Sequence, residues 1–341
     1  MTDLRIAVLG VGLMGADHVD RITNKISGAR VAAVSDRSPQ RAHAVAHNIE
    51  GCQIVDDPFD AIASTEIDAV ILSTPGEAHE KQVHACLDHR KPVLCEKPLT
   101  TEASSALGIV EREAGLGIRL IQVGFMRRFD HEYIQLESLL TSGQIGQPLL
   151  AHCIHRNRVP GPNFTSESLI TDSLVHEADV TRFLFKEEIT TVQIIKPTAS
   201  AGAPPGLQDP QIALFRTESG RHIDVEVFVG TGVGYEVRTE VVGEFGSATI
   251  GHDVGLIKTG APGTWGGNLT PTFLERFSQA YTDQLQRWVN AIRKGPTTGD
   301  FTDGPTAADG YAAAAVCSAA KQSLRTGQPV EIVPPTHETC R

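Results

Sequence analysis

Short apolar runs alternate with helical stretches over about the first 123 residues of the chain. Strands are predicted at residues 4–9, 30–35, 69–72, 92–95 and 119–123. The run at 69–72 contains no polar position, which is typical of a strand buried on both faces of a parallel sheet. Ser38 and Pro39 read as an N-cap followed by proline at the first helical position. This alternation predicts a doubly wound parallel sheet.

The pattern of apolar positions changes after about residue 148. Residues 223–229 and 237–241 alternate apolar and polar side chains with a period of two. Such alternation indicates antiparallel strands with one covered face. Residues 197–210 and 260–271 are rich in turn-forming residues.

Two helices are predicted near the end of the chain. The first covers residues 272–294 and is expected to end at Gly295 and Pro296, with cations in its last turn. The second, at about 305–325, is rich in alanine, and its small side chains favour close packing back toward the first domain. The predicted fold class is therefore α/β. A Rossmann domain over 1–124 precedes an α+β domain over 125–341 with a mostly antiparallel open sheet.

Length and composition limit the functional classes. A chain of 341 residues suggests two domains, and 40% hydrophobic with 21% charged residues is typical of a globular protein. The formal net charge of −11 argues against a nucleic-acid partner. No apolar run reaches the roughly 18 residues of a membrane span, and no signal peptide is recognisable. The six cysteines lack metal or disulfide spacing, so we expect free thiols in the cytoplasm.

The chain begins with a glycine motif after its first predicted strand. Gly10, Gly12 and Gly15 have GxGxxG spacing and open a helix, and Asp36 ends the next strand. In a dinucleotide site the first glycine makes the turn, the second admits the pyrophosphate and the third permits close helix packing. An acidic residue at the second strand favours NAD over NADP, whereas Arg37 is placed to hold a 2′-phosphate. The less expected alternative is a glycine-rich turn without a ligand.

Other candidate residues follow later strands. Thr74 and Pro75 end the 69–72 strand, where the chain passes a bound cofactor or simply stops. Glu96, Lys97 and Pro98 follow the next strand. A lysine there can stabilise negative charge on a reacting oxygen, or it can be a solvated surface lysine. The expected cofactor residues are Gly10, Gly12, Leu13, Met14, Gly15, Asp36, Arg37, Thr74, Pro75, Glu96 and Lys97.

The second domain offers a candidate general base. Asp172 and His176 are four residues apart and Asp179 follows three later, so one helix face would carry all three. A neutral imidazole suits removal of an alcohol proton, because its reference pKa is about 6.5. An ordinary surface acid–imidazole pair is the alternative, and by spacing alone it is favoured. No metal site is expected, because His79, His84 and His89 recur at intervals of five, off one helix face.

These motifs resemble the glucose–fructose oxidoreductase, inositol dehydrogenase and rhizopine catabolism (Gfo/Idh/MocA) family over nearly the whole chain. Residues 123–130, 155–157, 172–179 and 234–235 are most similar to its NAD-dependent inositol dehydrogenase branch. The resemblance implies a catalytic group of Lys97, Asp172 and His176. It also implies a polyol pocket shaped by Arg127, Asn157, Asp179 and Tyr235, joined by the catalytic group.

The implied reaction is NAD-dependent oxidation of a ring secondary alcohol, with myo-inositol giving scyllo-inosose as the leading expectation. The alternatives are another inositol isomer or an aldose, or a redox-silent sugar sensor. The proline-rich segment 158–164 departs from the resemblance and bears on which polyol fits. The resemblance also implies a homo-oligomer, expected to be a tetramer.

Overall fold

A computed structural model of the chain describes residues 2–161, 163–252, 257–261, 263–266 and 269–332. The chain divides into two compact units. The first contains the residues up to Met126 together with Tyr281–Ala314, and the second contains Arg127–Ala280 and the described residues from Ala315 onward. The sequence predicts one domain boundary, after residue 124. In the structure the chain leaves the first unit after Met126 and returns to it at Tyr281.

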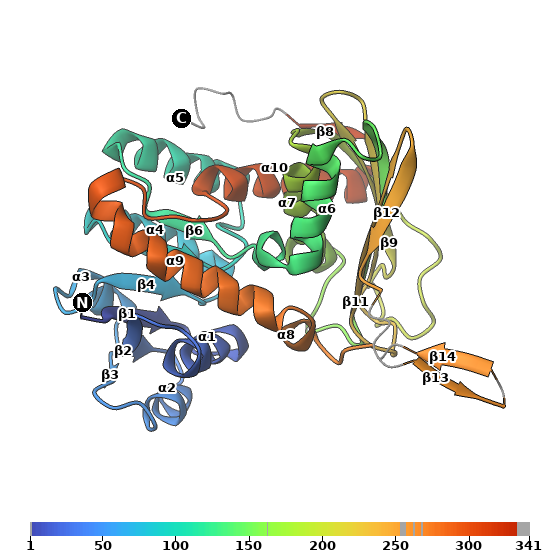
Figure 1. Cartoon of the computed structure of the whole chain (residues 1–341). Coiled ribbons are helices and arrows are strands. Elements are labelled where there is room, and N and C mark those ends of the chain that lie inside the picture. The colour runs from blue at the N-terminus through green and yellow to red at the C-terminus, as the bar shows by residue number, and fades with distance from the viewer. Residues whose placement is uncertain (1, 162, 253–256, 262, 267–268, 333–341) are drawn as a thin grey trace. The chain divides into compact units, whose positions relative to one another are not determined.

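The first unit is built on a parallel sheet of six strands in the order β3-β2-β1-β4-β5-β6 (Figure 1). The strands are β1 (Leu4–Leu9), β2 (Ala29–Ser35), β3 (Gln53–Ile54), β4 (Ala69–Leu72), β5 (Val93–Cys95) and β6 (Ile121–Val123). Every residue of β4 is buried, which explains its uninterrupted apolar sequence. The strand order reverses between β1 and β4, and a doubly wound sheet binds ligands at such a switch point. The predicted Rossmann sheet is confirmed.

Helices follow the strands of this sheet, and local sequence sets where they begin. They are α1 (Leu13–Asn24), α2 (Pro39–Ala46), α3 (Pro58–Ala63), α4 (Gly76–Asp88) and α5 (Ala103–Leu116). The Ser38 hydroxyl accepts the Arg41 N–H at 3.4 Å, and the Asp57 carboxylate accepts the Phe59 N–H at 2.9 Å. Each cap is followed by proline at the first helical position. The predicted start of a helix at Ser38 and Pro39 is confirmed.

A helix from the second half of the chain completes the core of the first unit. It is α9 (Ser278–Thr298). Its residues Leu285, Trp288, Val289 and Ile292 pack in one hydrophobic cluster with residues of β1, β2 and α1. Trp288 has no exposed surface, and a fully buried apolar side chain contributes about 1.5–3 kcal/mol.

The end of α9 differs from the prediction. The helix continues through Pro296 to Thr298 instead of stopping at Gly295. Gly299, with a φ of 73°, follows the last turn, and its N–H donates to the Gly295 oxygen at 2.8 Å. Gly295 serves packing instead, since a Cβ there would lie 2.2 Å from the Phe301 ring. The predicted helix is also divided at its start, with α8 (Phe273–Arg276) preceding α9.

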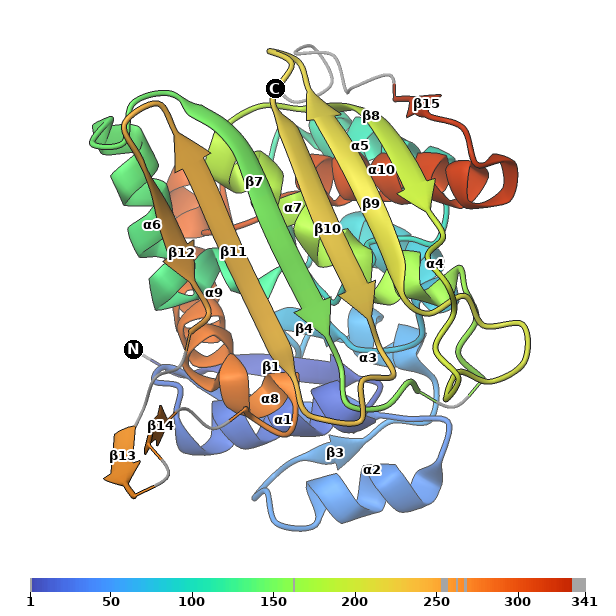
Figure 2. The same ribbon diagram turned by 90° about the vertical axis from the view of Figure 1, so that its right-hand side faces the viewer.

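The second unit contains a sheet of seven strands in the order β12-β11-β7-β10-β9-β8-β15 (Figure 2). The strands are β7 (Pro148–Arg156), β8 (Ile189–Ile195), β9 (Gln211–Thr217), β10 (His222–Phe228), β11 (Glu236–Gly243), β12 (Gly246–Ile250) and β15 (Val330–Glu331). Neighbouring strands are antiparallel except β7 and β10, which run parallel. The predicted mostly antiparallel sheet is confirmed. Strand β10 pairs parallel with β7 and antiparallel with β9.

Helices cover one face of this sheet, as Figure 2 shows for α6 and α7. The helical segments are η1 (Met126–Phe129), α6 (His131–Ser142), η2 (Leu169–Leu174) and α7 (Val175–Phe185), while α10 (Ala307–Thr326) begins in the first unit and ends in the second. Buried residues alternate along β11, as the period of two predicts. The stretch predicted to be turn-rich at 260–271 instead overlaps a strand pair, β13 (Ile257–Gly260) and β14 (Gly263–Gly266). Among the described helices, none has the length and apolar character that a membrane span requires.

Candidate active site

The glycine motif forms a tight turn between β1 and α1. Gly10 has a φ of 83°, and a Cβ there would lie 2.6 Å from the Ser73 oxygen. A Cβ on Gly15 would lie 1.8 Å from the Gly10 oxygen, so α1 can approach the turn only with glycine there. A Cβ on Gly12 would meet nothing within 4 Å. Gly10 and Gly15 are therefore required by the protein's own packing, whereas Gly12 leaves open space at the N-terminus of α1, where anions bind.

Asp36 lies at the carboxyl end of β2 with a side chain only 5% exposed. Its carboxylate accepts the N–H groups of Val11 at 2.9 Å and Ser38 at 2.8 Å, and it pairs with Arg41 at 2.8 Å. Burial raises the pKa of Asp36, but these hydrogen bonds outweigh it and hold the pKa below its ordinary value. The carboxylate is thus kept charged, and its cationic partner is Arg41 rather than the exposed Arg37.

A cavity of about 800 Å³ lies beside the glycine turn. It is lined by Gly10, Gly12, Ser35, Asp36, Arg37, Arg41, Asp56, Pro58, Phe59, Ser73, Thr74, Pro75, Glu77, Ala78, Lys81 and Gln82. The predicted cofactor residues Gly10, Gly12, Asp36, Arg37, Thr74 and Pro75 therefore share one cavity. The cavity has open space at Gly12 and contains the buried Asp36 carboxylate. These features and its volume fit a dinucleotide. Leu13, Met14, Gly15, Glu96 and Lys97 do not line it; Leu13 is 66% exposed at the start of α1.

Glu96 and Lys97 follow β5 on the neighbouring loop. The Glu96 carboxylate is buried and contacts His18 Nε2 of α1 at 2.8 Å, while its second oxygen lies 3.3 Å from the Lys97 N–H. A Cβ on Gly124 would lie 2.9 Å from the same carboxylate, so glycine leaves room for it. Lys97 is half-buried, and its peptide bond to Pro98 is cis. Glu96 thus fixes the backbone of the candidate lysine rather than contacting the cavity.

Asp172 and His176 do not lie on one regular α-helix, which corrects the prediction. Asp172 belongs to η2, a π-helical segment, and His176 to α7. At the junction the Val175 N–H donates to the Ile170 oxygen, five residues back. The wider turn changes the angle between successive side chains, and such π segments are frequent at functional sites. His176 is buried, with 6% of its surface exposed.

A buried charge network adjoins His176 through the neighbouring ring of His155. The guanidinium of Arg127 pairs with the Glu177 carboxylate and also lies 3.0 Å from His155 Nδ1, while Glu177 lies 3.2 Å from the same nitrogen. Each of the three residues is at most 3% exposed. Burial raises the pKa of Glu177, but the charges of Arg127 and His155 outweigh it, so the pKa lies below its ordinary value. The ring centroids of His155 and His176 are 6.2 Å apart.

The predicted pocket residues of the second unit have different surroundings. The Asp179 carboxylate is held by Arg128 at 2.6 and 3.0 Å, whereas Arg127 belongs to the charge network. Tyr235 is buried against the His155 ring, with centroids 5.8 Å apart, and burial raises its pKa to about 12. The Asn157 amide oxygen is buried and has no hydrogen-bond partner in the described part of the chain. A bound polar group would satisfy that oxygen.

Sequence reasoning missed several of these residues. Glu177 and His155 lie inside segments that carried the family resemblance, but neither was assigned a role. A signal existed for Glu177, since a carboxylate flanked by buried residues of α7 requires a partner. Arg41 and His18 carried no signal, because their partners Asp36 and Glu96 are fixed by the fold. The described residues include no cluster of histidine, cysteine and acidic side chains that would hold a metal ion.

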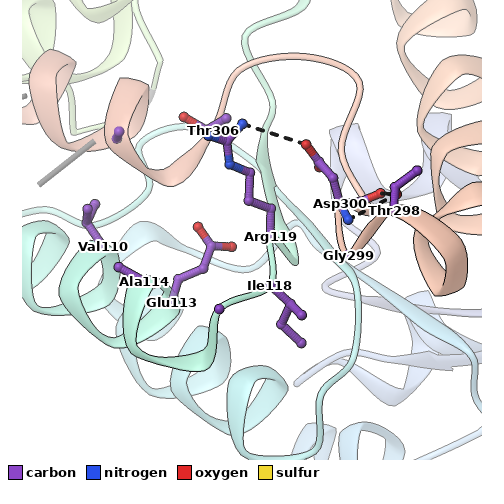
Figure 3. A pocket seen from close by; sticks show the side chains of 11 residues that line it. Val110, Glu113, Ala114, Ile118, Arg119, Thr298, Gly299, Asp300 and Thr306 are labelled. Atoms are coloured by element: carbon purple, nitrogen blue, oxygen red, sulfur yellow. Dashed lines mark hydrogen bonds and ion pairs between the residues drawn. The ribbon is translucent and has the colours of Figure 1, made fainter. Parts of the chain in front are cut away.

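A second cavity of the first unit, of about 310 Å³, is shown in Figure 3. It lies at the end of α5, where Arg119 and Asp300 pair at 3.6 Å. The Glu113 carboxylate accepts the N–H groups of Leu120 at 2.8 Å and Ile121 at 2.7 Å. Those polar contacts hold the start of β6 in place. The two cavities have no described lining residue in common.

A dinucleotide turn in the first unit and a buried imidazole on a second α/β unit define a nucleotide-dependent oxidoreductase. Two family models match the chain. One describes an oxidoreductase family with an NAD-binding Rossmann fold and matches residues 4–125; the other describes the C-terminal α/β domain of that family and matches residues 137–332. The chain belongs to the Gfo/Idh/MocA oxidoreductase family, and the predicted resemblance is confirmed.

Individual relatives resemble the chain over almost its whole length. Inositol 2-dehydrogenase from Rhodococcus erythropolis is 64% identical over 97% of this chain and 95% of that protein. Inositol 2-dehydrogenase from Mycolicibacterium smegmatis is 61% identical over 97% of each. Among solved structures, myo-inositol dehydrogenase from Lactobacillus casei in complex with NAD(H) and myo-inositol has a TM-score of 0.94 at 35% identity and covers 100% of both chains.

Proposed function

We propose that this oxidoreductase is an NAD-dependent inositol 2-dehydrogenase that oxidises myo-inositol to scyllo-inosose, its 2-keto form. The observation that carries the proposal is the full-length likeness to inositol 2-dehydrogenases, at 64% and 61% identity. The Lactobacillus casei structure at 35% identity, which contains NAD(H) and myo-inositol, supports the same substrate.

The second unit also suits a polyhydroxylated substrate. Two of its buried polar atoms, the Asn157 oxygen and Arg127 Nε, lack a hydrogen-bond partner among the described residues. Buried polar atoms are normally paired, so these atoms favour a ligand that brings hydroxyl groups. A wrong epimer would leave them unpaired, which discriminates between polyols. Arg127, Asn157, Asp179 and Tyr235 remain our proposed pocket residues.

The proposed mechanism places Lys97, Asp172 and His176 on one substrate. His176 takes the proton of the reacting hydroxyl, and Asp172 orients the imidazole or a neighbouring hydroxyl. Lys97 stabilises the negative charge that develops on the oxygen. When bound, NAD⁺ accepts the hydride that leaves the same carbon, which gives the ketone and NADH.

NAD is also the cofactor that we propose to be preferred over NADP. The Asp36 carboxylate is held charged by Val11, Ser38 and Arg41, and it faces the cavity that contains Gly12. A fixed negative charge accepts hydrogen bonds from ribose hydroxyls and repels a 2′-phosphate.

The test is NADH formation by the purified protein against a panel of inositol isomers and common aldoses, with NAD⁺ and NADP⁺ in parallel. We expect turnover on myo-inositol with NAD⁺ and a ketone product identified by mass spectrometry. Turnover only on another isomer or an aldose would retain the mechanism and replace the substrate. Bound NADH without turnover on any polyol would instead identify a sensor that has lost catalysis.

The homotetramer remains a prediction from the family resemblance, and the cytoplasmic location remains a prediction from the cysteine pattern. Light scattering coupled to size-exclusion chromatography measures the first, and a monomer at micromolar concentration would contradict it. Fractionation of the producing cells measures the second.

A further inference from the structure

The buried face of α4 carries a histidine that contacts two loops at once. His79 is 1% exposed and lies in the first turn of the helix, which begins at Gly76. Its Nε2 lies 2.8 Å from the Thr74 carbonyl oxygen, and its Nδ1 lies 2.8 Å from the Pro98 carbonyl oxygen. These carbonyls follow β4 and β5, adjacent strands whose carboxyl ends form the edge at which such sheets bind ligands.

Two neighbours of His79 on α4, Gln82 and Gly76, also contact the Thr74 and Pro98 loops. The Thr74 hydroxyl donates to Gln82 Oε1 at 2.6 Å, and Gln82 lies three residues after His79 on the same helix face. A Cβ on Gly76 would lie 3.3 Å from the Pro98 ring, so the second loop is packed closely on the helix start. The first turn of α4 is therefore a junction between the two loops.

We propose that His79 is a positioning residue that fixes the Thr74 loop for the cofactor and the Pro98 loop for the lysine. This inference rests on the proposed function, because it takes Thr74 to border NAD and Lys97 to act on the substrate. Each ring nitrogen then has its own task. The Nε2 contact governs cofactor affinity, whereas the Nδ1 contact holds the residue next to Lys97 and governs turnover.

The number of protons on the ring makes the two contacts separable. Carbonyl oxygens only accept hydrogen bonds, and a neutral imidazole has a single N–H. Burial lowers the pKa of His79 against the opposing influence of the two carbonyls, Glu96 and Glu77, which favours the neutral ring. A neutral ring donates to the Pro98 carbonyl in one tautomer and to the Thr74 carbonyl in the other. A variant with a donor at only one of these positions keeps one contact and removes the other.

Amide side chains provide such variants. The amide nitrogen of asparagine takes the position of Nδ1, and that of glutamine takes the position of Nε2. His79→Asn keeps the Pro98 contact, so we expect the Kd for NADH to rise about fivefold to tenfold, while kcat at saturating NAD⁺ changes less than about twofold. His79→Gln keeps the Thr74 contact, so the Kd for NADH should change less than about twofold. Its kcat should fall about tenfold or more, as misplaced catalytic groups cause.

Two further variants calibrate the result. His79→Phe keeps a ring without a donor and should show both defects, whereas His89→Asn, at the exposed end of α4, should show neither. The proposal would be overturned if the two amide variants lost NADH affinity and kcat equally, in proportion to their loss of melting temperature. His79 would then only stabilise the core. The titration of NADH fluorescence does not need a substrate. It therefore tests the Nε2 contact even if the wild-type protein fails to oxidise inositols, an outcome that would count only against the proposed function.

The wild-type protein permits a test without any variant. Nitrogen-15 NMR of the histidine rings should show a slowly exchanging His79 N–H whose chemical shift moves when NADH binds, because one acceptor borders the cofactor. A His79 signal that NADH leaves unchanged would overturn the link between this ring and the cofactor loop, whether or not the variants fold.

Discussion

The first unit builds its part of the candidate site mainly from backbone, whereas the second builds its part from buried charges. Around Gly10, Gly12 and Thr74, the contacts are glycine turns and carbonyl oxygens. Around His176, they are an arginine and a carboxylate that solvent hardly reaches. A pyrophosphate is the same in every dinucleotide, so a backbone cradle is sufficient for it. A polyol has to be distinguished from its epimers, which requires fixed side-chain donors and acceptors.

The largest expected effects come from the groups that would touch the reacting atoms. Lys97→Ala and His176→Ala should each lower kcat by about 10²–10⁴, the usual contribution of a positioned acid or base, and NADH should still bind. Steady-state kinetics with a fluorescence titration measure both quantities. The exposed Lys196→Ala is the control. Near-normal turnover in either variant would remove that residue from the mechanism.

Loss of a buried charge should destabilise the second unit strongly. Glu177→Ala leaves the Arg127 guanidinium buried without its carboxylate, which should cost about 3–5 kcal/mol of unfolding free energy. Glu167→Ala breaks an exposed pair with Arg325 in the same unit and should cost at most about 1 kcal/mol. Urea unfolding followed by circular dichroism compares them. Similar losses in the two variants would show that the buried network contributes no more than a surface pair.

The glycine turn allows packing and ligand binding to be separated. Gly15→Ala places a methyl group against the Gly10 oxygen and should cost about 1–3 kcal/mol of stability. Gly12→Ala meets no protein atom, so its melting temperature should stay unchanged while the Kd for NADH rises at least about tenfold. Differential scanning fluorimetry with and without NADH reads both effects. Unchanged affinity in Gly12→Ala would place the pyrophosphate elsewhere.

A smaller effect is expected on the choice of cofactor. Asp36→Asn removes the charge and frees Arg41 from its ion pair. The Val11 and Ser38 N–H groups donate to different carboxylate oxygens, so the single amide oxygen keeps only one of these two hydrogen bonds. The ratio of kcat/KM for NADP⁺ to that for NAD⁺ should rise about tenfold, or ~1.4 kcal/mol. Arg37→Ala tests the exposed neighbour and should leave the ratio nearly unchanged in the wild-type background. A ratio unaffected by Asp36→Asn would show that another residue selects the cofactor.

The pH dependence of stability should show the weakest of these effects. The folded-state pKa of Glu177 lies below its ordinary value of 4.5, so the unfolded state binds more protons in this range. The stabilisation by Glu177 is complete above that ordinary value and is lost as the pH falls through the folded-state pKa. Urea unfolding between pH 3 and pH 7 should therefore show a smaller acid loss for Glu177→Gln than for the wild type. Parallel curves would assign the acid loss to other carboxylates.

The contrast between the units explains what the sequence could reveal. Glycine turns and proline-containing helix starts depend on only a few neighbouring residues. The turn at Gly10 and the helix cap at Ser38 could therefore be predicted from the sequence. The ion pair of Arg127 and Glu177 joins residues 50 positions apart, and apolar periodicity does not specify partners at that distance. The π-helical turn at Asp172 was unpredictable for another reason. One additional residue in a turn leaves the composition and the apolar pattern almost unchanged.

The packing of α9 has a consequence for the order in which the protein is made. Leu285, Trp288 and Ile292 belong to the core of the unit that begins at the N-terminus, so a ribosome supplies them only after synthesising Arg127–Ala280 of the second unit. Until then the apolar surface around Ile6 and Ile22 stays uncovered on the nascent chain. At 5–20 residues per second, the roughly 170 residues from 127 to 298 represent about 10–30 seconds of exposure. We therefore expect the nascent chain to need chaperone protection over this interval, and a fragment ending at residue 126 should aggregate when produced alone.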